Sequence, residues 1–200
     1  MFSQLHDLLV SVFFELGPVW RHVFTFVLSF GEGVPILGSF LPGGTIALLI
    51  GSLTEEAFIK PWVAVHLIAI GSLMGDLLGF FFGKKMLHFS WVKNFVHKEK
   101  HAKAWDLFDR HAAMVIIFSK SIPIIRSTPA LFAGVRNMKT SKYIPYALTG
   151  SYIWALFGIF GGKYLAQIFG DKAVVVIVGI LVLSIIIGIS TSIIKRTEKD

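Results

Sequence analysis

Cysteine is absent from this 200-residue sequence, and charged residues make up only 16% of it. The absence of cysteine excludes both a disulfide framework and thiolate chemistry. Soluble domains carry about 25% charged residues, whereas this chain combines its low charge with 54% hydrophobic residues and a mean hydropathy of +0.72. The composition therefore predicts an integral membrane protein.

Enzymatic signatures are missing as well. The sequence contains no Gly-x-Ser-x-Gly, His-Glu-x-x-His or P-loop motif, and no histidine follows His111. The last absence speaks against a membrane lipid phosphatase, which combines a basic motif with downstream histidines. His97 and His101 are four residues apart, but neither cysteine nor an acid cluster completes a zinc site. We expect no enzymatic activity, no cofactor and no metal.

The apolar run 112–135 contains Lys120 and Arg126 together with Pro123 and Pro129. A charge at the centre of a bilayer costs from about 2.5 to above 10 kcal/mol. A proline inside a helix kinks or breaks it. An ordinary lipid-facing span would not carry these four residues, so the run predicts either a functional site or a buried ion-pair cluster.

Two acidic residues in or beside other apolar runs, Glu32 and Asp76, can neutralise this basic pair. In one interpretation, the four charges form a structural cluster that holds the protein together. In the other, they bind an anionic group. Arg126 then offers a fork of donors suited to phosphate and Lys120 a point charge, while Glu32 and Asp76 take up and release protons.

The segment 84–111 is rich in Lys, Arg and aromatic residues, which is typical of an amphipathic helix on an anionic membrane surface. Loops rich in Lys and Arg remain in the cytoplasm. If run 112–135 enters the membrane and returns to the same side, thirteen Lys and Arg lie inside and three outside. This distribution favours a re-entrant hairpin, whose broken backbone is tolerated where protein buries it.

An internal repeat supports this topology, because a set of small and basic positions recurs at a constant offset of 79 residues. Each copy follows a proline-broken apolar run, and the two copies run in opposite directions in this topology. Inverted repeats with broken helices are typical of secondary transporters, whose sites lie between the repeats. The recurring positions are Gly71-Ser72, Gly79 and Gly83-Lys84 in the first copy and Gly150-Ser151, Gly158 and Gly162-Lys163 in the second.

We therefore predict an all-α polytopic membrane protein with an inverted repeat, two opposing re-entrant helical hairpins, about four transmembrane helices and an interfacial amphipathic helix. Loop 84–111 and the C-terminus lie in the cytoplasm. The hairpin turns are expected at Pro42, Gly43, Gly44, Pro123 and Pro129. The single membrane domain 1–200 comprises, in order, an interfacial helix and first span in 1–31; repeat 1 in 32–86, with hairpin 34–53 and span 61–83; a cytoplasmic amphipathic helix in 87–111; repeat 2 in 112–165, with hairpin 112–135 and span 143–162; and a last span in 173–194.

Short motifs follow one another along residues 30–165. They are Phe30-Gly-Glu32, Phe40-Leu-Pro-Gly43, Gly51, Gly75-Asp76 with Gly79 and Gly83-Lys84, Phe108-x-Arg110-His111, Phe118-Ser-Lys120-Ser-Ile-Pro123-Ile-Ile-Arg126, Ala133-Gly134, Met138 and Gly150. In combination and in this order, they resemble the DedA family, also called the SNARE-associated or VTT-domain family.

The resemblance implies two facing re-entrant hairpins and proton-coupled transport of lipids, either undecaprenyl phosphate or a phospholipid, across the bacterial cytoplasmic membrane. The essential acids and arginines of the family correspond to Glu32, Lys120 and Arg126, with Arg110 as a supporting basic residue. Many members carry an acid where this chain has Gly44, which shifts the expected proton coupling toward Glu32 and Asp76. Many also carry arginine where this chain has Lys120, which keeps the charge but loses a bidentate contact.

The favoured hypothesis is a flippase for a phosphate-headgroup lipid in the cytoplasmic membrane. Its partners are membrane lipids and protons, without nucleic acid, and its oligomeric state is left open. A proton-coupled carrier of a small ion or solute is the alternative transporter. A non-transporting structural membrane protein, whose ion pairs serve folding only, is the third hypothesis.

Overall fold

The computed structural model describes residues 17–35, 37, 43–54, 59–86, 102–121, 126, 128–173, 176–177 and 179. In these residues all regular secondary structure is helical, which confirms the predicted all-helical class. The helices are α2 (Pro18–Gly33), α4 (Gly43–Leu53), α5 (Pro61–Met86), α7 (Ala102–Ser119), α8 (Thr128–Val135) and α9 (Thr140–Phe169), followed by the short 3-10 helix η2 (Gly170–Lys172).

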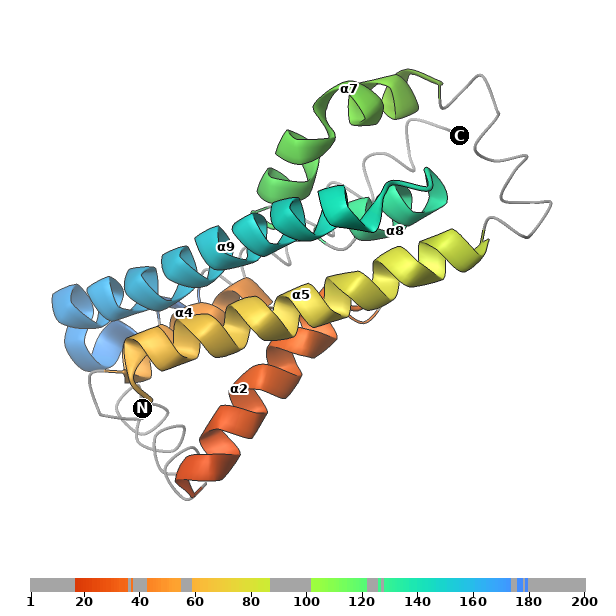
Figure 1. Cartoon of the computed structure of the whole chain (residues 1–200). Coiled ribbons are helices and arrows are strands. Elements are labelled where there is room, and N and C mark those ends of the chain that lie inside the picture. Colours follow the sequence, from red (N-terminus) through yellow and green to blue (C-terminus); the bar gives the residue numbers. More distant parts are fainter. Residues whose placement is uncertain are drawn as a thin grey trace, which may run out of the picture.

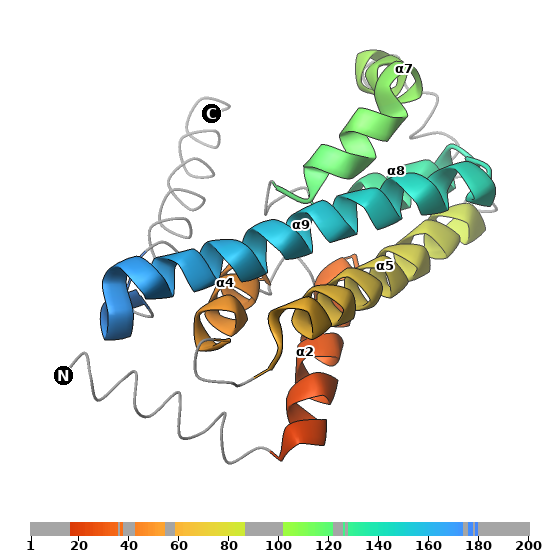
Figure 2. The same cartoon turned by 60° about the vertical axis from the view of Figure 1, so that its left-hand side comes forward.

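Two long helices, α5 and α9, form the centre of the molecule. They lie side by side and run in opposite directions (Figures 1 and 2). Both are long and apolar enough to cross a membrane, and the predicted spans 61–83 and 143–162 lie within them. Helix α2 packs obliquely against α5, α4 packs on α9, α8 packs on α5, and α7 lies on the outer side of α9 (Figure 1).

Three prolines occupy the first turns of helices. Pro18 and Pro61 are the first residues of α2 and α5, and Pro129 is the second residue of α8. In a first turn the missing proline N–H has no intrahelical partner to lose, and the fixed φ already suits a helix. Pro129, which the sequence places at a hairpin turn, therefore lies at a helix start, whereas Pro42 and Pro123 are outside the described residues.

Helix α7 runs across the predicted boundary between the surface helix 87–111 and the hairpin 112–135. At His111 its backbone is non-helical, with φ −125° and ψ 28°, so the composition changes where the helix is kinked. Residues 1–16 of the predicted interfacial helix and first span (1–31), residues 87–101 and most of the last span 173–194 are outside the described residues.

Backbone contacts at glycine join α4 to α9 and α8 to α5. A Cβ atom at Gly162 in α9 would collide with the backbone carbonyl oxygen of Leu48 in α4. A Cβ atom at Gly134 in α8 would lie only 3.0 Å from the Cα of Gly83 in α5. Small residues allow such close helix approach in membranes, so each long helix holds one short helix by direct backbone packing.

Replacing Gly162 by alanine is expected to destabilise the protein by about 1–3 kcal/mol, because the added methyl group overpacks the α4 contact. Gly161→Ala is the matched control. Its Cβ would meet only the side chain of Leu48, at 3.4 Å, which is an ordinary contact. Thermal unfolding in detergent should separate the two variants, and equal melting temperatures would contradict the packing argument.

Candidate functional site

Two ion pairs lie buried inside the helical bundle. The Nζ atom of Lys120 pairs with Oδ2 of Asp76, and Nη2 of Arg126 lies 2.8 Å from Oε2 of Glu32. All four side chains are at most 5% exposed. The structure thus brings together the four charged residues that stand out in the apolar runs of the sequence.

Glycine contacts between α2 and α5 place the two acids side by side. A Cβ atom at Gly33 would lie 2.5 Å from the carbonyl oxygen of Ser72 and 2.9 Å from the amide nitrogen of Asp76, and one at Gly75 would lie 2.7 Å from the Cα of Gly33. Only residues without a Cβ let two helix backbones approach this closely. Glu32 precedes Gly33 and Asp76 follows Gly75, so both carboxyl groups lie at the crossing.

The two cations come from the break between α7 and α8. Lys120 is the first residue after α7, and Arg126 lies in the connection that leads to α8. Both side chains point into the protein, where the acids of the continuous helices α2 and α5 neutralise them. Non-helical backbone at membrane depth is tolerated in such protein-buried positions.

Lys120 has one neutral and one charged partner. Its Nζ atom donates to Oγ of Ser72 at 2.9 Å and to Oδ2 of Asp76. Ser72 and Asp76 are four residues apart and therefore share a face of α5. This spacing from Asp76 was the signal that could have identified Ser72 as a site residue, which the sequence interpretation missed.

The pair of Arg126 and Glu32 is less completely bonded. Although the two side chains are 2.8 Å apart, neither Nη2 of Arg126 nor Oε1 of Glu32 has a hydrogen-bond partner among the described residues. At this distance the two groups form an ion pair, but the N–H group of Arg126 is poorly aligned with the carboxylate oxygen for a hydrogen bond. The guanidinium carbon also lies 5.2 Å from the ring centroid of Trp154, within range of a cation–π contact. Among the described residues, the hydrogen bonding of this pair is therefore incomplete.

The two pairs form a single electrostatic cluster. Lys120 is close enough to Arg126 and Glu32, as well as to its partner Asp76, for all three charges to act on it. The cluster contains two positive and two negative charges, which sum to zero. Losing any one of them would leave an uncompensated buried charge, which is strongly destabilising.

Aromatic rings of α5 and α9 pack beside the cluster. Phe80 and Tyr143 stack with ring centroids 4.2 Å apart and planes inclined by 3°. Tyr143 lies close enough to Asp76 to be affected by its charge. Sequence reasoning missed both Tyr143 and Trp154 as neighbours of the charges, and no spacing or motif in the sequence points to them.

The remaining predicted site residues lie elsewhere. Arg110 is on the exposed side of α7, where its Nε is 3.0 Å from Oδ1 of Asp106, so it does not belong to the buried cluster. Gly43 and Gly44 are the first two residues of α4. Within the described part of the chain, no group of three His, Cys, Asp or Glu residues could hold a metal ion. His97 and His101 fall outside that part.

Comparison with known proteins identifies relatives over most of the chain. Residues 41–164, which include Asp76, Lys120 and Arg126 but not Glu32, match the family model of the VTT domain. The chain is 27% identical over 157 residues to protein DedA of Escherichia coli (strain K12), covering 75% of this chain and 71% of that protein. It is 27% identical over 151 residues to inner membrane protein YohD of the same strain, with 71% and 76% covered. No solved structure matches it significantly.

Proposed function

Because this chain belongs to the VTT-domain, or DedA, family of membrane proteins, we propose that it is a flippase for a phosphate-headgroup lipid. The substrate is undecaprenyl phosphate or a phospholipid, and the membrane is the bacterial cytoplasmic membrane. Lys120 and Arg126 bind the headgroup phosphate, while the prenyl or acyl tail remains in the lipid. Glu32 and Asp76 couple this binding to protons.

One observation carries the proposal, namely the burial of the Arg126 guanidinium beside Glu32 with incomplete hydrogen bonding among the described residues. A pair that only served stability would be expected to satisfy its hydrogen bonds in the interior. Here Nη2 of Arg126 and Oε1 of Glu32 have no hydrogen-bond partner among the described residues, although both side chains are at most 5% exposed. A phosphate oxygen supplies the acceptor that a guanidinium binds best, in a bidentate contact.

Charge balance gives Glu32 and Asp76 their role in this mechanism. The resting cluster is neutral, so a phosphate that enters it adds negative charge to a buried site, which is unfavourable without compensation. Protonation of Glu32 releases Arg126 to the phosphate, and protonation of Asp76 releases Lys120 in the same way. Deprotonation restores the original pairs and expels the headgroup. Headgroup movement is thereby coupled to proton uptake and release.

Reciprocal packing of the short helices supports an inverted repeat with two re-entrant hairpins. Gly83 in α5 and Gly162 in α9 are equivalent positions of the predicted repeat. Gly83 meets α8, which belongs to the second copy, and Gly162 meets α4, which belongs to the first. The antiparallel course of α5 and α9 (Figure 1) fits two copies that cross the membrane in opposite directions.

The distribution of basic residues supports the proposed orientation. The C-terminal end of α5 and the N-terminal end of α9 meet where Nζ of Lys84 donates to Oγ1 of Thr140 at 3.2 Å. The basic residues Lys85, Arg136, Lys139 and Lys142 lie at or near these same two helix ends. Positively charged ends remain in the cytoplasm, so this end of the bundle is assigned to the cytoplasmic side.

The proposal is tested in sealed proteoliposomes that contain the full-length protein. We expect fluorescent undecaprenyl phosphate, phosphatidylethanolamine or both to cross faster than in protein-free vesicles, and an imposed pH gradient to change the rate. A protein that dissipates the pH gradient without moving either lipid would instead be the small-ion carrier. A protein that moves neither lipid nor protons would support the structural alternative.

A further inference from the structure

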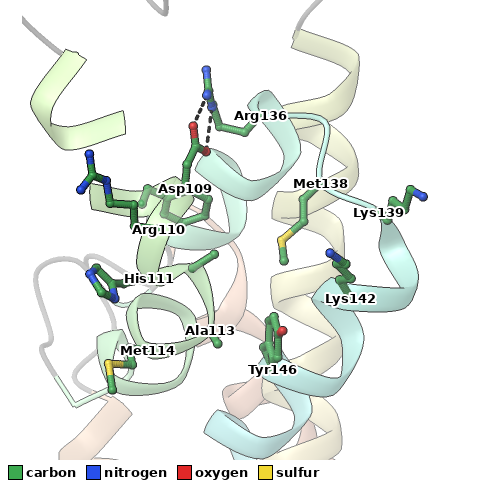
Figure 3. A pocket seen from close by; sticks show the side chains of 12 residues that line it. Asp109, Arg110, His111, Ala113, Met114, Arg136, Met138, Lys139, Lys142 and Tyr146 are labelled. Atoms are coloured by element: carbon green, nitrogen blue, oxygen red, sulfur yellow. Dashed lines mark hydrogen bonds and ion pairs between the residues drawn. The ribbon is translucent and has the colours of Figure 1, made fainter. Parts of the chain in front are cut away.

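A second site lies on the surface of the molecule, between α7 and the start of α9. The cavity there has a volume of about 520 Å³. Figure 3 shows Arg110, His111 and Met114 on the α7 side and Met138, Lys142 and Tyr146 on the side of α9. It is separate from the buried cluster, because none of the four buried charged residues lines it.

Positive charge dominates the lining of this cavity. The lining contains four cations, Arg110, Arg136, Lys139 and Lys142, and one acid, Asp109. Arg110 pairs with Asp106, which does not line the cavity. Asp109 is occupied by Arg136, whose Nε donates to Oδ1 at 3.1 Å (Figure 3). The side chains of Lys139 and Lys142 are exposed and have no ion-pair partner among the described residues. An anionic ligand would therefore meet the uncompensated ammonium group of Lys142, and Lys139 adds positive charge at the rim, where its side chain points away from α7 (Figure 3).

The same cavity also has an apolar side. Phe108, Met114, Met138 and Tyr146 contribute to its lining. Met114 is 62% exposed, and Phe118, four residues further along α7, is 61% exposed. Residues four apart share a helix face, so an exposed apolar track leads from the cavity along α7. A soluble anion would not use such a track, whereas an acyl chain would.

We propose that this cavity binds the headgroup phosphate of an anionic phospholipid, with its acyl chain lying along Met114 and Phe118. Lys142 contacts the phosphate, Lys139 adds positive charge at the rim of the cavity, and the lipid comes from the leaflet on this side of the membrane. Basic pockets between membrane helices are suited to anionic headgroups. The lipid is a bound partner at the edge of the protein and is distinct from the lipid that the buried cluster is proposed to move.

The direct test is native mass spectrometry of the full-length protein titrated with phosphatidylglycerol. Lys139→Gln/Lys142→Gln is expected to bind this lipid about 30-fold more weakly than wild type, since each lysine near a membrane surface contributes about 1 kcal/mol. Lys60→Gln/Lys85→Gln removes the same charge outside the cavity and is expected to retain wild-type affinity. Both variants change exposed side chains, and equal melting temperatures without lipid confirm that they fold.

Two outcomes would overturn the proposal. In the first, Lys139→Gln/Lys142→Gln binds phosphatidylglycerol like wild type, or the control variant loses as much affinity. The latter result would mean that the overall positive charge of the protein, and not this cavity, determines lipid affinity. In the second, inorganic phosphate raises the melting temperature as much as phosphatidylglycerol does and Phe118→Gln has no effect on lipid affinity, which would make free phosphate the ligand. We expect Phe118→Gln to weaken phosphatidylglycerol binding and zwitterionic phosphatidylcholine to bind more weakly than phosphatidylglycerol.

Discussion

Replacing Glu32 and Arg126 together by glutamine is expected to leave a folded protein that moves lipid at least about 100-fold more slowly. Removing both charges leaves no uncompensated ion in the interior, and such paired replacements are often neutral. The transported phosphate, however, loses charge-assisted hydrogen bonds from Arg126 worth about 1.5–3 kcal/mol each. Two such bonds account for a rate loss of about 100-fold or more.

The experiment compares translocation rates in proteoliposomes with melting temperatures in detergent. The melting temperature of Glu32→Gln/Arg126→Gln should fall by less than about 4 °C, which corresponds to about 1 kcal/mol. Tyr152→Phe is the control, because it removes a hydrogen bond between α9 and His66 of α5, with a length of 3.0 Å, away from the cluster. We expect this control to translocate lipid like wild type.

The structural hypothesis makes a different prediction for the same double variant. If Glu32 and Arg126 serve folding only, a protein that folds without them also transports without loss. Wild-type translocation by a stable Glu32→Gln/Arg126→Gln protein would therefore remove the headgroup role from Arg126.

Replacing Lys120 alone by glutamine is expected to destabilise the protein by about 3–5 kcal/mol, because it leaves Asp76 as an unpaired buried charge. Both side chains of this pair are at most 5% exposed, so water cannot take over the role of the lost ammonium group. Adding Asp76→Asn should restore most of the stability, since the double variant again contains no lone charge. Reversible unfolding in mixed micelles measures all three proteins.

Arg110→Gln provides the matched control for this change, because it removes one cation from an exposed pair. The side chains of Arg110 and Asp106 are 71% and 58% exposed, and exposed pairs contribute about 0–1 kcal/mol. If Lys120→Gln destabilised the protein no more than Arg110→Gln, the Lys120–Asp76 pair would not be a buried pair in the membrane-embedded protein.

The four charges of the cluster could be predicted from the sequence because a charge in an apolar run has few alternatives. It either pairs with an opposite charge or lies in a water-filled site, and two acids and two bases allow complete pairing. Which acid meets which base could not be predicted. That choice depends on the crossing of α2 and α5 at Gly33 and Gly75, and on where the chain breaks after α7. Both depend on contacts between segments far apart in the sequence.

Helix boundaries were less predictable than helix composition. The change in composition near His111 suggested the end of a surface helix, but the helix continues through a kink at that residue. A proline such as Pro129 breaks a helix only when a preceding turn exists, and the sequence alone did not show that α8 begins at Thr128. Trp154 was missed for a related reason, because its contact with Arg126 depends on side chains brought together only by folding.

The most direct test of the account is whether wild-type protein distinguishes lipids by their phosphate group. Fluorescent undecaprenyl phosphate and a fluorescent cationic lipid that lacks phosphate can be followed in parallel proteoliposomes, with protein-free vesicles as the baseline. The buried cations Lys120 and Arg126 predict that only the phosphate lipid crosses faster than the baseline. Equal acceleration of both lipids would contradict phosphate recognition by the buried cluster, and so would a failure of both undecaprenyl phosphate and phosphatidylethanolamine to cross faster than the baseline.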